Sequence, residues 1–120
     1  MFKYCNINPE GKRVGDCVVR AISLALDIPY DEVLSILYTN SNYFNCDMLV
    51  RDCYSKVLSE DFGLPKFDGM GKTVREVIED FNDSVLIIRI ENHLTASIGG
   101  VVYDIWDPSE EIVDIFWVVE

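Results

Sequence analysis

The sequence predicts an α+β fold in which N-terminal helices pack on a C-terminal antiparallel sheet. Up to residue 82, apolar residues recur at helical spacing, and beyond it they follow a strand-like pattern. Helices followed by strands, rather than a strict alternation of the two, are typical of α+β proteins. A chain of 120 residues is long enough for one hydrophobic core, so a single domain over residues 1–120 is expected.

The helices are predicted from apolar residues at positions i, i+3, i+4 and i+7. Val18, Ala21 and Ile22 begin the first such stripe, and Thr73 with Glu76 forms a capping box ahead of the last one. The second helix is expected to fade in the polar residues 39–43. The expected helices cover residues 16–26, a short segment around 33–37, residues 50–63 and residues 74–81.

The second half of the chain is predicted to be sheet, because β-branched and alternating residues replace the helical pattern. Gly99-Gly100 is a two-residue hairpin signal between two of the strands. The expected strands cover residues 85–90, 93–98, 101–106 and 112–119.

Composition excludes several classes of function. The net charge of -11 argues against a surface that follows nucleic-acid phosphates, since such surfaces need clustered Lys and Arg. The apolar stretches are too short to span a membrane, and the first residues lack the apolar core of a secretory signal. We therefore expect a cytoplasmic protein with no nucleic-acid or membrane partner.

The four cysteines do not form the spacings typical of zinc sites, so no metal and no cofactor is expected. Cys46 and Cys53 are seven residues apart within a helical pattern and are interpreted as small core residues. A cytoplasmic chain does not require a disulfide.

Cys17 and His93 carry the main indication of chemistry. Cys17 falls in the first turn of a predicted helix, where unpaired backbone N–H groups and the helix dipole favour the thiolate. His93, the single histidine, opens a predicted strand, and its side of that strand lies near the cysteine if the first helix packs there. The two residue types form a nucleophile and its base. The alternative is a buried structural cysteine with an unrelated surface histidine.

A third group could orient the imidazole, and two aspartates compete for that role. A two-residue loop at Gly99-Gly100 pairs His93 with Trp106, which puts Asp104 on the histidine's face of the sheet and Asp107 on the other. A bulge would shift the pairing by one residue and favour Asp107 instead. The residues alone leave this choice open.

Three runs of sequence, GDCVVRA (15–21), NHLTA (92–96) and YDIWD (103–107), resemble small papain-like cysteine peptidases encoded by bacteriophages and their prophages. The resemblance implies a papain-like fold with Cys17 as nucleophile, His93 as base and Asp107 as the orienting acid. Asp107 precedes Pro108, similar to the Asp-Pro of bacteriocin-leader peptidases and transglutaminases, so the resemblance favours Asp107 over Asp104.

The oxyanion hole departs from that family. Papain has a glutamine six residues before its cysteine, and this chain has Gly11 there. Asn8, with Asn6 in reserve, is the nearest upstream amide that could serve, although an Asn-Pro turn explains it equally well. Trp106 could shield the His–Asp hydrogen bond from water or could be a core residue.

These residues predict a cysteine-dependent amide hydrolase, a peptidase, isopeptidase or deamidase, acting on a protein or peptide through a thioester. Residues 39–46 and 63–72 are the loops expected to give specificity. One alternative is transglutaminase-type acyl transfer on the same triad. Another is a non-catalytic phage protein that binds and inhibits a host bacterial protein.

Overall fold

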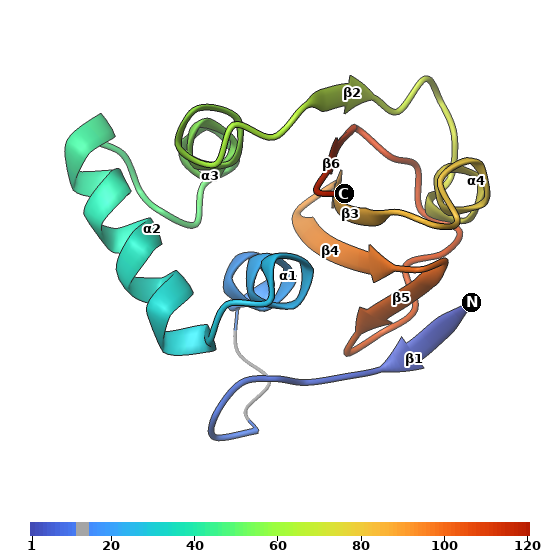
Figure 1. Ribbon diagram of the computed structural model, residues 1–120, viewed down its shortest axis with the longest axis horizontal. Coiled ribbons are helices and arrows are strands. Elements are labelled where there is room, and N and C mark those ends of the chain that lie inside the picture. The colour runs from blue at the N-terminus through green and yellow to red at the C-terminus, as the bar shows by residue number, and fades with distance from the viewer. Residues whose placement is uncertain (12–14) are drawn as a thin grey trace.

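The fold is known from a computed structural model, which describes residues 1–11 and 15–120 (Figure 1). Helices dominate the part before residue 82 and strands the part after it, as the change in apolar period predicts. The elements in chain order are β1 (Phe2–Tyr4), α1 (Cys17–Leu26), α2 (Tyr30–Phe44), α3 (Arg51–Lys56), the π-helical turn η1 (Val57–Asp61), β2 (Lys66–Asp68), α4 (Val74–Asp80), β3 (Val85–Ile90), β4 (His93–Ile98), β5 (Val101–Asp104) and β6 (Ile115–Val118).

The strands form one six-stranded sheet in the order β1-β5-β4-β3-β6-β2. The sheet is mixed rather than purely antiparallel, because β1 pairs with β5 in parallel. The expected set of strands lacked β1 and β2, the two edge strands, each of only three residues. Such short strands do not complete a recognisable alternating pattern.

Helices cover both faces of the sheet, each above its own hydrophobic core. On one face α1, α2 and α3 bury residues such as Ile22 and Leu37 against Leu94 and Trp117 of the sheet. On the other face α4 packs Val77 and its neighbours against the opposite side chains of the same strands. Helix α1 packs on the Leu94 face of β4.

Two tight turns fix the register of the central strands. Ile90 pairs with His93 across a two-residue turn whose second residue, Asn92, has φ of 56°. Ile98 pairs with Val101 across Gly99-Gly100, where both glycines have positive φ, which glycine adopts without steric cost. The predicted register of this second hairpin is therefore confirmed.

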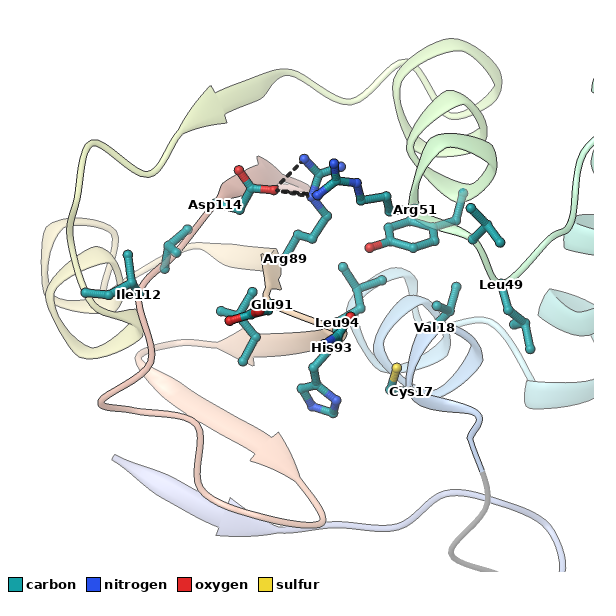
Figure 2. Close-up of a pocket in the computed structure, with 15 residues that line it drawn as sticks. Cys17, Val18, Leu49, Arg51, Arg89, Glu91, His93, Leu94, Ile112 and Asp114 are labelled. Atoms are coloured by element: carbon teal, nitrogen blue, oxygen red, sulfur yellow. Dashed lines mark hydrogen bonds and ion pairs between the residues drawn. The ribbon is translucent and has the colours of Figure 1, made fainter.

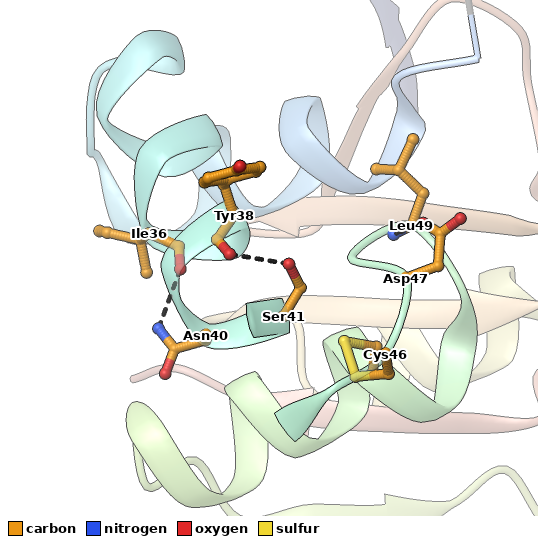
Figure 3. The surroundings of a disulfide bond; sticks show 8 residues. Ile36, Tyr38, Asn40, Ser41, Cys46, Asp47 and Leu49 are labelled. Carbon is orange, nitrogen blue, oxygen red and sulfur yellow. Dashed lines mark hydrogen bonds between the residues drawn. A yellow bond between two sulfur atoms is a disulfide. The ribbon is translucent and has the colours of Figure 1, made fainter. Parts of the chain in front are cut away.

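Helix α2 is longer than the sequence pattern predicts, because the polar residues after Tyr38 remain helical. Asn40 donates a hydrogen bond to the Ile36 carbonyl at 2.9 Å, and the Ser41 hydroxyl donates to the Tyr38 carbonyl at 2.7 Å (Figure 3). These side chains bond back onto their own helix instead of ending it. The helix ends at Asn45, which has a left-handed backbone conformation.

A disulfide joins Cys46 to Cys53 and closes the loop between α2 and α3 (Figure 3). The interpretation of the two cysteines as small core residues is confirmed for Cys53 and wrong for Cys46, which is only half-buried. Cys53 is fully buried in α3, but Cys46 lies in the preceding loop rather than in the helix. The spacing of seven therefore reflects a loop that folds back on the helix, not one helical face.

Candidate active site

Cys17, His93 and Asp104 meet where the N-terminus of α1 lies beside the end of the sheet. Cys17 is the first residue of α1, His93 is the first residue of β4, and Asp104 is the last residue of β5. The His93 ring lies beside the Cys17 thiol at one end of a cleft (Figure 2). Helix α1 packs on β4, so its N-terminus holds Cys17 close to the start of that strand.

His93 is paired with Asp104 and not with Asp107. Its Nε2 lies 2.7 Å from Asp104 Oδ2, and the Asp104 side chain is 2% exposed. Asp107 lies on the surface, and its carboxylate accepts hydrogen bonds from the backbone N–H and the hydroxyl of Ser109. The preference for Asp107 is therefore corrected, because the register of the Gly99-Gly100 hairpin puts Asp104 beside His93.

Arg20 joins Asp104 to a second buried carboxylate, Asp16. Its Nη1 lies 3.2 Å from Asp104 Oδ1, and its Nε lies 2.8 Å from Asp16 Oδ1. All three side chains are buried, with 2% to 8% of each exposed. The i, i+4 spacing puts Asp16 and Arg20 on the same side of α1. This spacing is visible in the sequence, although the pair is not among the predicted site residues.

The side-chain amide of Asn8, the expected oxyanion donor, contacts Asp16. Its Nδ2 donates to Asp16 Oδ2 at 2.9 Å and lies 3.4 Å from the hydroxyl of Tyr30. Tyr30 donates to the same Asp16 oxygen at 2.8 Å. Asn8 therefore helps to hold the carboxylate that precedes the cysteine, and its role as an oxyanion donor stays a prediction.

The backbone of α1 supplies donors near the thiol. The first helical hydrogen bond runs from the N–H of Arg20 to the carbonyl of Asp16 at 3.0 Å. The N–H groups of Cys17, Val18 and Val19 therefore precede the hydrogen-bonded series of the helix, as the first N–H groups of any helix do. Donors of this kind stabilise negative charge beside them.

The two reactive side chains perturb each other's protonation. Burial alone would raise the pKa of the Cys17 thiol, but hydrogen bonds with His93 and the Leu94 backbone, with the charges of His93 and Arg20, lower that pKa below its ordinary value. Burial opposes the charged form of His93, yet the hydrogen bonds and charges of Asp104 and Cys17 raise its pKa to about 9. Each group therefore favours the ionised form of the other, the thiolate beside the imidazolium.

The two carboxylates of the network remain ionised. Burial is the largest single effect and raises the pKa of Asp104, but its hydrogen bonds, first that with His93, and the charge of His93 together lower the pKa. Burial acts in the same direction on Asp16, whose pKa is lowered by hydrogen bonds from Asn8, Arg20 and Tyr30. Two buried negative charges therefore lie next to the catalytic candidates. Asp16 is the residue before Cys17, and Asp104 is hydrogen-bonded to His93.

The indole of Trp106 lies against the imidazole of His93 in a tilted arrangement. Its ring centroid is 4.8 Å from that of His93, and the two planes are inclined by 46°. The indole is 39% exposed, so it is not a core residue. It covers part of the imidazole from solvent, as one of the two sequence interpretations expected.

A cleft of about 920 Å³ extends from Cys17 and His93 along this end of the sheet, past the end of β3 to the segment before β6 (Figure 2). Its floor includes the buried residues Val18 and Leu94, and its two walls are residues 49–51 at the start of α3 and residues 112–114 before β6. The segments expected to give specificity, residues 39–46 and 63–72, do not line it. The walls come together only in the folded chain, so no local pattern could predict them.

The described residues contain no cluster of His, Cys, Asp and Glu that could hold a metal ion. No helix within residues 1–11 and 15–120 is both long and apolar enough to cross a bilayer. No protein-family model, curated protein or solved structure matches the chain. The site therefore has to be interpreted from its own geometry.

Proposed function

We propose that this protein is a cysteine-dependent amide hydrolase with a Cys17–His93–Asp104 triad and a papain-like mechanism. The observation that supports this most strongly is the chain of contacts from a half-buried thiol at a helix N-terminus to His93 and on to a buried carboxylate. The three residues have the roles of nucleophile, base and orienting acid that acyl transfer to a thiol requires.

In the proposed reaction, the Cys17 thiolate attacks the amide carbonyl carbon and forms a carbon–sulfur bond. The backbone N–H groups at the start of α1 stabilise the resulting oxyanion. His93 Nε2 faces Asp104, which leaves Nδ1 to donate its proton to the leaving nitrogen as the carbon–nitrogen bond breaks. Water, deprotonated by His93, then attacks the thioester, releases the carboxylic acid and restores the thiolate.

The cleft favours an amide carried by a polypeptide. Leu49, Val50 and Ile112 are 40% to 58% exposed on its two walls, which leaves apolar surface on either side of the opening. Exposed apolar surface around a concave site is typical of ligand recognition. We therefore expect substrates with an apolar side chain close to the scissile or modified amide.

The test compares the alkylation of the two free cysteines by iodoacetamide across pH, using mass spectrometry. Cys5 is the internal control, because it is also half-buried and is not part of a disulfide. Cys17 should react at least about tenfold faster than Cys5 at pH 7, and His93→Ala should remove that advantage. Equal rates for the two thiols in the wild-type protein would disprove an activated nucleophile.

Turnover is then measured with a library of fluorogenic and glutamine-containing peptides, with and without an added primary amine. Hydrolysis or deamidation without the amine supports the hydrolase, and incorporation of the amine indicates a transferase. Cys17→Ala should abolish all turnover, and turnover that survives this substitution would exclude the mechanism.

A further inference from the structure

We infer that Arg20 is a positioning residue that holds Asp104 against His93 and offsets the charge of Asp16, so that Cys17 ionises beside two buried carboxylates. The inference rests on the proposed function only in treating Cys17 as the nucleophile. It starts from the juxtaposition of Asp16, Arg20 and Asp104, which connects the residue before the nucleophile to the partner of the base.

The geometry gives Arg20 a role in orientation. Asp104 Oδ1 accepts from Arg20 Nη1 at 3.2 Å and from the backbone N–H of Ile105 at 2.7 Å. These two donors fix one carboxylate oxygen, which directs the other, Oδ2, at His93 Nε2. A planar guanidinium with several fixed donors suits such a role better than the single ammonium of lysine.

The charges give Arg20 a second role. With Cys17 and His93 in the ionised state, the buried site holds three negative groups, Asp16, Asp104 and the thiolate. Two positive groups, Arg20 and His93, oppose them. Within the part of the chain that the structure describes, removing Arg20 leaves the imidazolium as the positive group that opposes the two carboxylates and the thiolate in this network. Like charges in a buried site disfavour each other's ionised form, so the thiolate becomes harder to form.

The groups on the far side of the thiol do not replace Arg20. Across the cleft, Arg89 donates to Asp114 and Ser55, and Arg51 also has Asp114 as an ion-pair partner, 3.9 Å away. Burial raises the pKa of Tyr54 to about 12, so its hydroxyl is neutral. Glu91, exposed in the turn before His93, adds a further negative charge to the cleft.

The experiment measures the pKa of Cys17 from the pH dependence of its alkylation rate, resolved from that of Cys5 by mass spectrometry. Arg20→Met should raise the Cys17 pKa by about one unit or more and slow alkylation at pH 7 by about tenfold. Arg20→Lys keeps the charge and should restore most of the pKa. It should leave peptide turnover reduced, because lysine does not hold both carboxylates in the same geometry.

The decisive variant is Asp16→Asn/Arg20→Met, which removes one negative and one positive group together. In this double variant the Cys17 pKa should return toward the wild-type value. A purely structural role for Arg20 predicts instead that the Cys17 pKa of the double variant is raised at least as much as in Arg20→Met. Circular dichroism confirms that each variant is folded. An unchanged Cys17 pKa in folded Arg20→Met would overturn the inference.

These outcomes are distinct from failure of the proposed function. If no peptide is turned over but the Cys17 pKa follows the pattern above, Arg20 controls a reactive thiol that does not hydrolyse amides. If peptides are turned over and the pKa ignores Arg20, the triad stands without it.

Discussion

The residues around His93 determine how its imidazole is charged and held. His93 is the one histidine in the chain, so its resonances are assigned without ambiguity in an NMR titration. We expect a midpoint near the pKa of about 9 that follows from its contacts with Asp104 and Cys17. Asp104→Asn should lower that midpoint by about one unit or more, since it removes the buried counter-charge. Asp107→Asn is the matched control and should leave the midpoint unchanged; the reverse pattern would restore Asp107 as the partner.

The same shift predicts how stability depends on pH. A pKa raised from 6.5 to about 9 on folding stabilises the protein fully below pH 6.5, and this contribution is lost as the pH rises through the folded value. The lowered pKa of Cys17 makes stability depend on pH in the opposite direction. The contribution of His93 is therefore measured in a Cys17→Ala background, where Asp104 still raises the pKa of His93. There, the difference in the free energy of unfolding between His93 and His93→Gln should decline as the pH rises above 6.5, as measured by urea denaturation. A difference that grows over this range would contradict the charged pairing.

At the scale of elements, Gly69 controls how closely the loop before α4 approaches the wall of the cleft. Its N–H donates to the Asp114 carbonyl at 2.9 Å, and a Cβ added there would lie 2.1 Å from the Val113 carbonyl oxygen. Gly69→Ala must therefore displace backbone, and should lower the free energy of unfolding by about 1–3 kcal/mol. Gly15→Ala is the control, because a Cβ at Gly15 meets no atom within 4 Å. Equal thermal midpoints for the two variants would show that the approach is not constrained.

The disulfide between Cys46 and Cys53 constrains the segment between α2 and α3. It closes a loop with a sequence separation of seven, and the enclosed residues 49–51 form one wall of the cleft. Chain entropy predicts that Cys46→Ala/Cys53→Ala lowers the free energy of unfolding by about 2.5 kcal/mol. Dithiothreitol should destabilise the wild type and leave the double variant unaffected. A wild-type protein that is indifferent to the reductant would show that the bond does not stabilise this wall.

At the scale of the whole molecule, the net charge of -11 influences how fast a charged substrate reaches the cleft. Surface charge steers an oppositely charged ligand toward its site, and salt screens this attraction over a Debye length of about 10 Å at 0.1 M. If peptide turnover is found, kcat/KM for a substrate flanked by lysines should fall as salt rises from 0.05 to 0.5 M. For the same peptide flanked by glutamates it should rise. Two parallel salt curves would indicate that binding in the cleft alone sets the rate.

Much of this arrangement could be predicted from local sequence, because local spacing reports on local structure. The stripe that begins at Val18 marks α1, the capping box at Thr73 and Glu76 is present at the start of α4, and the glycine pair sets the β4–β5 register. That register was also the better guide to the partner of His93, since Asp104 and not Asp107 lies beside it.

Only the tertiary structure decided what surrounds these residues. Arg20 contacts both Asp16 and Asp104, and Asp104 is 84 residues away from it in sequence. The longer contact forms because α1 packs beside the end of β5. The sharing of Asp16 among three donors and the two walls of the cleft depend in the same way on segments that meet only after folding. Periodicity reports which side of an element is buried, whereas the identity of the groups that meet there is set by the packing of distant elements.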